Sequence, residues 1–66
     1  MNVTINGKAE QVQSGTVLDL LKAKHIEPQM VAVELNDKML ERGHLETTQL
    51  HDGDQVEFLF YMGGGQ

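Results

Sequence analysis

The residues of this 66-residue chain that are best suited to chemistry lie at its C-terminal end. An apolar run gives way there to four residues, Gly63, Gly64, Gly65 and Gln66. Glycine loses the most entropy on ordering, so residues 63–66 are expected to form a flexible tail that projects from the folded domain. A glycine carboxylate is sterically open, as attack on the α-phosphate of ATP would require. Glycine-rich ends also serve as linkers, and composition alone leaves both interpretations open.

Other side chains with chemical potential are arranged less favourably. His25, His44 and His51 lack the i, i+4 spacing of metal ligands, so we expect no metal site. Asp52 and Asp54 flank a glycine, and we expect them to hold a turn rather than to act as an acid pair. No glycine-rich phosphate loop precedes a helix, so we expect no bound ATP or other cofactor. Cysteine is absent, which excludes disulfides and thiol chemistry of the chain's own.

The charge balance narrows the class of partner. Five basic residues against ten acidic ones give a net charge of -5, which disfavours nucleic acid and anionic membranes. All the basic residues lie within the first 42 positions, so the C-terminal part is acidic and would either attract a basic partner or simply aid solubility. No apolar stretch reaches the length of a signal peptide or membrane span. We therefore expect a cytoplasmic protein that is monomeric when free.

The first half of the chain predicts a hairpin followed by a helix. Apolar and polar residues alternate from position 1, and Asn6-Gly7 is the strongest short hairpin signal. The second strand, over residues 8–13, is mostly polar, as suits a sheet edge. Thr16 is the expected N-cap of a helix with Asp19 in its first turn, and Pro28 forbids continuation.

The second half predicts three more strands. Residues 31–40 form a second hairpin around Asn36-Asp37. Leu45 and Leu50 are expected to plug the core from a loop that ends in a tight turn at Gly53. The last strand, residues 55–61, is apolar on both faces and should be central in its sheet. Val56, Phe58 and Phe60 are expected on one face, and Glu57, Leu59 and Tyr61 on the other.

Together these elements predict an α+β roll, in which a mixed sheet of four to five strands carries one helix on one face. Residues 1–62 would form this domain and residues 63–66 the tail. The sheet face without a helix is expected to carry an apolar patch of Ala32, Leu59 and Tyr61. Such patches mark interaction sites, although scattered surface hydrophobes are equally compatible with the pattern.

Five stretches resemble one known family in order and spacing: "VTINGK", "SGTVLDLL", "VAVELNDKMLER", "DGDQVEFL" and the glycine tail. Over essentially the whole chain they are similar to the ubiquitin-like sulfur carriers, specifically the ThiS family of thiamine biosynthesis. The resemblance implies a β-grasp fold and a carrier protein that is not an enzyme. A ThiF-type enzyme would adenylate its terminal glycine with Mg-ATP, and a cysteine persulfide relay would convert it to a thiocarboxylate. Thiazole synthase of the ThiG type would then receive the sulfur.

Carried over by position, the family's Gly-Gly end falls on Gly64 and Gly65, with Gly65 supplying the reactive carboxyl group and Gly63 extending the flexible segment. The docking surface corresponds to the patch of Ala32, Leu59 and Tyr61. Gln66 departs from the pattern, so it is either removed, tolerated or foreign to the native chain. A metallopeptidase trims an extra residue in related carriers of homocysteine and methionine synthesis, which is an alternative function. A small subunit like that of molybdopterin synthase (MoaD) is another, and a ubiquitin-like protein modifier is a third.

Overall fold

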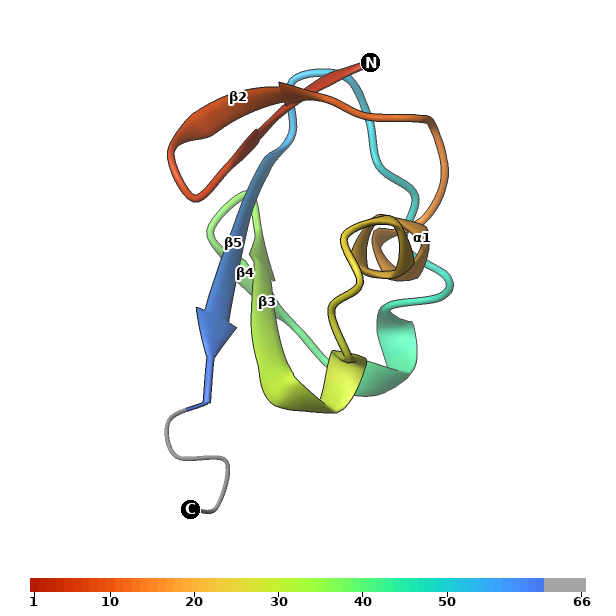
Figure 1. Cartoon of the computed structure of the whole chain (residues 1–66), viewed down its shortest axis with the longest axis vertical. Coiled ribbons are helices and arrows are strands. Elements are labelled where there is room, and N and C mark those ends of the chain that lie inside the picture. The colour runs from red at the N-terminus through yellow and green to blue at the C-terminus, as the bar shows by residue number, and fades with distance from the viewer. Residues whose placement is uncertain (62–66) are drawn as a thin grey trace.

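The computed structural model describes residues 1–61, in which five strands form a single mixed sheet with one α-helix beside it (Figure 1). The strand order is β2-β1-β5-β3-β4; β1 and β5 are parallel, and the other neighbours are antiparallel. This arrangement confirms the predicted α+β roll. The elements are β1 (Asn2–Ile5), β2 (Lys8–Gln11), α1 (Val17–Ala23), the 3-10 helix η1 (Pro28–Met30), β3 (Val31–Leu35), β4 (Lys38–Leu40), the 3-10 helix η2 (Arg42–His44) and β5 (Gln55–Phe60).

The opening hairpin forms where its turn residues predicted it. Asn6 and Gly7 have φ angles of 49° and 83°, the left-handed pair that a two-residue hairpin turn requires. β2 is the outer strand and is mostly exposed, which confirms its predicted place at the sheet edge. Asn36 and Asp37 repeat the same turn between β3 and β4, with φ angles of 51° and 70°.

The start of α1 is fixed by a reciprocal pair of hydrogen bonds. The Thr16 hydroxyl accepts from the Asp19 backbone N–H, and the Asp19 carboxylate accepts from the Thr16 N–H. These bonds hold the pKa of Asp19 below its usual value, because they favour the charged form. The loop after η2 completes the cap, since the carbonyl groups of Leu45 and Thr48 accept from the first N–H groups of the helix.

α1 ends at Ala23, before Pro28, which agrees with the prediction that the helix does not continue to this proline. His25 adopts a left-handed φ of 60°, and the N–H of Ile26 donates to the carbonyl of Leu21. This is a Schellman motif, in which a left-handed residue closes the last turn and an apolar residue follows it. His25 therefore lies just past the C-cap Lys24 and closes the helix end, and Pro28 then starts η1.

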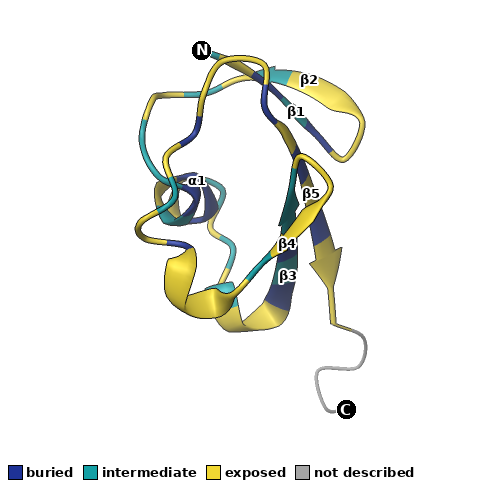
Figure 2. Ribbon diagram, turned by 180° about the vertical axis from the view of Figure 1, so that it is seen from behind, coloured by how far each residue is buried: buried dark blue, intermediate teal, exposed yellow. Residues whose placement is uncertain are grey.

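The core lies between α1 and the sheet face that the helix covers (Figures 1 and 2). Leu45 and Leu50 are buried in it, which confirms that the long loop plugs the core. Within residues 1–61, no helix combines the length and the apolarity that crossing a lipid bilayer demands. The buried apolar residues are Val3, Ile5, Val17, Leu20, Leu21, Val31, Val33, Leu45, Leu50, Val56 and Phe58.

β5 occupies the middle of the sheet, between β1 and β3, as predicted. Its expected inner face is only partly right: Val56 and Phe58 are buried, but Phe60 is 56% exposed. β5 runs past the end of β1, which pairs only with Gln55 and Val56. Phe60 therefore lies beyond the part of the sheet that the core covers.

Candidate functional site

The candidate site is the last strand and the sheet face around it. The residues that the sequence favours for chemistry, Gly63, Gly64, Gly65 and Gln66, lie outside the described residues. The structure therefore describes the part of the domain that precedes them. This part comprises β5, the hairpin turns on either side of it and the sheet face opposite α1.

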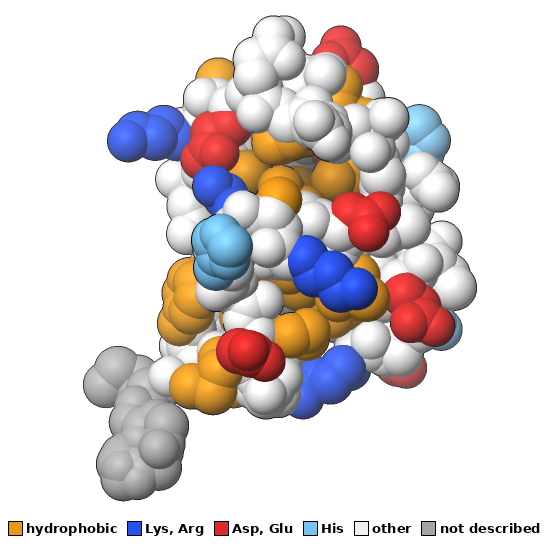
Figure 3. All heavy atoms as spheres, turned by 45° about the vertical axis from the view of Figure 1, so that its right-hand side comes forward, with side chains coloured by type: hydrophobic (Ala, Val, Ile, Leu, Met, Phe, Trp, Pro, Cys, Tyr) orange, Lys and Arg blue, Asp and Glu red, His pale blue; other side chains and the backbone are white. Residues whose placement is uncertain are grey.

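The side of the molecule that carries α1 offers no reactive cluster. Figure 3 shows charged side chains of both signs spread over this side, with apolar surface between them. A hollow of about 690 Å³ lies between β2 and α1, and its charged groups include Lys24 and Glu10, which bond to each other at 2.9 Å. In the described part of the chain, no three histidine or carboxylate side chains come together as metal ligands would.

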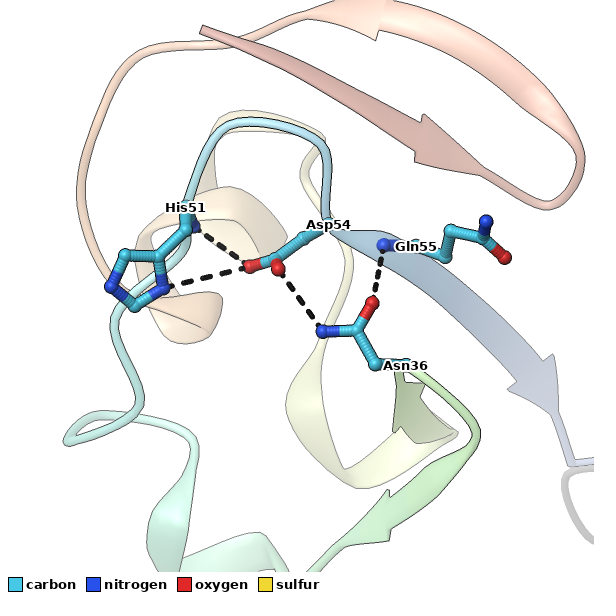
Figure 4. A network of polar contacts seen from close by, with 4 residues as sticks. All are labelled: Asn36, His51, Asp54 and Gln55. Carbon is cyan, nitrogen blue, oxygen red and sulfur yellow. Dashed lines mark hydrogen bonds and ion pairs between the residues drawn. The ribbon is translucent and has the colours of Figure 1, made fainter.

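Polar side chains hold the start of β5 (Figure 4). Asp54, only 8% exposed, accepts hydrogen bonds from the His51 backbone N–H at 2.7 Å and the Asn36 amide at 3.0 Å. The oxygen of the same Asn36 amide accepts from the Gln55 backbone N–H at 2.9 Å. Asp52 accepts from the Asn2 backbone N–H. Both aspartates therefore hold the backbone, as predicted, and neither is placed as an acid catalyst.

The turn between β1 and β2 bonds to the opposite edge of β5. The side-chain oxygen of Asn6 accepts from the backbone N–H of Phe58 at 2.8 Å, and its amide nitrogen donates weakly to the Phe58 carbonyl at 3.4 Å. The backbone N–H of Asn6 also donates to the carbonyl of Val56. The side-chain amide of Asn6 thus bonds to β5 as a backbone peptide group of β1 would, although β1 has already ended.

Beyond Phe58 the chain carries large apolar groups that face solvent. Leu59, Phe60 and Tyr61 are 44%, 56% and 51% exposed. The backbone N–H of Tyr61 donates to the carbonyl of Met30, so the pairing with the β3 side continues to the last described residue. This exposed segment leads directly to the glycines.

The predicted patch is assembled by the pairing of β3 with β5. Ala32 lies opposite Leu59 in the register, and a hollow of about 130 Å³ has Ala32, Met39 and Tyr61 in its lining. Ala32 itself is only half-buried rather than exposed. Met30 and Met39 are also exposed and enlarge the apolar surface. The alternation of the "VAVEL" and "KML" strands could have shown that Met39 lies next to this surface.

Acidic side chains border this apolar surface. Glu34 lies directly opposite Glu57 in the β3–β5 pairing, where like charges repel each other. Asp37 and the two glutamates line a second hollow, of about 170 Å³. An apolar patch beside negative charge suits a protein partner with an apolar and basic surface.

The site thus combines a well-bonded start of β5 with an exposed apolar segment at the end of the strand. Its well-bonded base is made of turns and buried carboxylate contacts, and its exposed residues 59–61 are apolar except for the hydroxyl group of Tyr61.

Comparisons with known proteins point in one direction. The model of the ThiS family matches residues 3–65. The sulfur carrier protein ThiS of Bacillus subtilis is 32% identical over 63 residues, covering 92% of this chain and 96% of that protein. A crystal structure of a thiamine biosynthesis protein (ThiS) from Geobacter metallireducens has 46% identity and a TM-score of 0.85, and the match covers 98% of this chain and all of that one.

A further relative is much longer than this chain. The thiazole synthase of Magnetococcus marinus is 36% identical over 67 residues. That match takes in the whole of this chain but only 21% of the relative, so the chain spans about a fifth of its length.

Proposed function

The chain belongs to the ThiS family, and from this premise we propose that it is a sulfur carrier of thiamine biosynthesis whose C-terminal glycine bears the sulfur. The carrier acts as the substrate of its partners and not as an enzyme. The strongest support is the extent of the family match, which runs from residue 3 through Gly65 and so includes all three glycines that precede Gln66. The names of the relatives, a sulfur carrier, a thiamine biosynthesis protein and a thiazole synthase, support the thiamine branch over the other carrier functions.

The chemistry takes place on the carboxyl group of Gly65. Its oxygen attacks the α-phosphate of ATP, which releases pyrophosphate and forms an acyl-adenylate. The terminal sulfur of a cysteine persulfide then displaces AMP and forms an acyl disulfide, and a second thiol cleaves the S–S bond, which releases the thiocarboxylate and leaves a disulfide between the donor cysteine and that thiol. This chain has no thiol, so sulfur that it carries must be held elsewhere, and a main-chain carboxyl group serves that purpose. Mg-ATP is bound by a ThiF-type activating enzyme.

The surface around Ala32, Leu59 and Tyr61 docks on that enzyme. It is apolar, it is bordered by Glu34 and Glu57, and it lies next to the segment that leads to the glycines. Aromatic and aliphatic groups beside a charged rim are typical of protein interfaces. A ThiG-type thiazole synthase receives the sulfur, a role supported by the relative that carries a similar segment within a thiazole synthase chain.

Gln66 must leave before Gly65 can react. While the Gly65–Gln66 peptide bond is intact, the carboxyl group of Gly65 is an amide carbonyl and cannot attack ATP. A metallopeptidase of the kind that trims related carriers would free it.

The first step can be tested by the exchange of labelled pyrophosphate into ATP, which requires reversible adenylation. A ThiF-type activating enzyme is incubated with the full chain, with the chain that lacks Gln66, and with the shortened chain carrying Gly65→Ala. We expect the exchange to be fastest with the shortened chain and strongly reduced by Gly65→Ala, because the added methyl group crowds the reacting carboxyl group. Equal exchange rates with the last two chains would contradict the assignment of Gly65.

A further inference from the structure

The backbone of β5 has an open edge near its C-terminal end. Gln55 and Tyr61 bond toward β3, through Asn36 and Met30 respectively. Val56 and Phe58 bond toward the other edge, where both meet Asn6. Because backbone groups alternate along a strand, the N–H and C=O of Phe60 must point to the same edge as those of Val56 and Phe58.

That edge has no occupant at Phe60 in the part of the chain that the structure describes. The pairing of β1 with β5 covers only Gln55 and Val56, and the amide of Asn6 extends it to Phe58. Within residues 1–61, neither the β1–β5 register nor the remaining backbone hydrogen bonds give Phe60 a partner on this side. Figure 1 shows the β1–β2 hairpin beside the first part of β5 only.

The edge also lacks the features that usually keep a strand from pairing with other chains. Natural edges carry lysine, proline, a bulge or a covering loop. The segment "FLFY" at positions 58–61 has no charge and no proline, and Phe60 is an exposed residue. In contrast, the true edge strand β2 carries Lys8 and Glu10.

We propose that an extended segment of the activating enzyme adds to the sheet at this edge, where it takes the place that β1 vacates and bonds to the backbone N–H and C=O of Phe60. The inference rests on the proposed function, which supplies the partner. Strand addition gains its affinity from main-chain hydrogen bonds, and these are the groups that Phe60 leaves available. The Asn6 amide shows that this edge accommodates a peptide-like group at 2.8 Å.

The choice of partner follows from the position of the edge. Phe60 is three residues before Gly63, so a strand paired here would fix the direction in which the chain leaves the sheet. For the protein that must receive the glycines, binding at this edge would therefore also position them. Docking on the face around Ala32 and Tyr61 would approach the same strand from its side chains, whereas strand addition approaches it from its backbone.

The first test is the hydrogen exchange of the Phe60 amide in the full chain, followed by NMR. In the free chain we expect this amide to exchange quickly, while its neighbour in the β3 ladder, Leu59, is protected. With the activating enzyme bound, the Phe60 amide should become protected. An amide that still exchanges quickly in the complex would overturn the proposal.

The same experiment separates other occupants of the edge. Protection of Phe60 in the free chain that grows with concentration would assign the edge to a second copy of this chain. Protection in the free chain at every concentration would assign it to residues that follow Tyr61. Either result would overturn the proposal.

A matched pair of variants tests the role of the N–H group itself. Phe60→Ala and Phe60→Pro both remove the ring, but only proline removes the donor, and the β3 ladder does not use the N–H of Phe60. We expect the proline variant to bind the activating enzyme roughly tenfold more weakly than the alanine variant, the effect of one lost hydrogen bond. Equal affinities would contradict strand addition.

Failure of this inference can be distinguished from failure of the proposed function. If the enzyme adenylates the chain while Phe60 stays unprotected, the carrier function stands and strand addition is wrong. If the enzyme neither binds nor adenylates the chain after removal of Gln66, the function is wrong and the inference is overturned with it.

Discussion

The two ends of β5 are held in opposite ways. At its start, Asp54 and Asn36 tie the strand to two loops through four hydrogen bonds of 2.7–3.0 Å, one of them from the Asn36 backbone. At its end, Phe60 is an exposed residue that lies beyond the pairing with β1, and Tyr61 is held by one backbone bond to Met30. One strand thus passes from the best-bonded polar site of the domain to an apolar end that projects beyond the core.

The contrast shows how a very small domain can present its chain end to another protein. Burial and internal bonding stabilise the fold, but they also occupy the groups that a partner would contact. Here the bonds are concentrated at the start of β5, so the groups at its end are available. A domain of 66 residues has a stability of about 3–10 kcal/mol, so it cannot lose many of these bonds.

The largest loss of stability is expected from Asp54→Ala. This change leaves the His51 N–H and the Asn36 amide without their buried acceptor, which should lower the free energy of unfolding by about 3 kcal/mol. Urea denaturation measures the loss. Asp52→Ala is the matched control, because Asp52 accepts one bond at an exposed site and should cost about 1 kcal/mol. Equal losses from the two variants would show that the start of β5 is not held as described.

Intermediate losses of stability are expected from changes in the two hairpin turns, and they differ between the turns. Asn36→Gly and Asn6→Gly both keep the left-handed φ, so the difference between them reports the side-chain amides. Asn36 bonds to buried Asp54 and to Gln55, whereas Asn6 bonds to Phe58 alone. We expect losses of about 2 and about 1 kcal/mol respectively, measured by urea denaturation. A greater loss of stability from Asn6→Gly than from Asn36→Gly would contradict the view that β5 is held most strongly at its start.

The smallest change in stability is expected at the exposed end. Tyr61→Ala should alter the free energy of unfolding by about 0.5 kcal/mol or less, because the side chain is 51% exposed and outside the strand. The same variant should bind the activating enzyme at least about tenfold more weakly, as a central aromatic contact does when truncated. Urea denaturation measures the change in stability, and a binding titration measures the change in affinity. Unchanged affinity would remove Tyr61 from the docking surface.

Local chemistry made much of the fold predictable. Asn6-Gly7 determines its turn because both residues tolerate positive φ, and Thr16 with Asp19 determines the helix start because their side chains bond within one turn. The central position of β5 followed from its apolar residues on both faces. In each case the cause lies within a few residues of the effect.

The features that were missed depend on contacts distant in sequence. Phe60 is exposed because β1 is shorter than β5, and its own apolar character gives no sign of this. Asn6 reaches Phe58 across 52 positions, so the turn motif could not reveal its second role. The left-handed conformation of His25 is a local feature that was not predicted, since histidine adopts a positive φ less often than glycine. For residues 63–66, the candidate site rests on composition and family membership.

The most direct test of the carrier function is the intact mass of the chain that lacks Gln66, after incubation with the activating enzyme, Mg-ATP and a sulfur donor. We predict a mass increase equal to the exchange of one oxygen atom for one sulfur atom. Fragmentation should place it at Gly65, and it should be absent when ATP is omitted or when Gln66 is retained. No mass increase with an enzyme that adenylates the chain, or sulfur located at any other residue, would contradict the account.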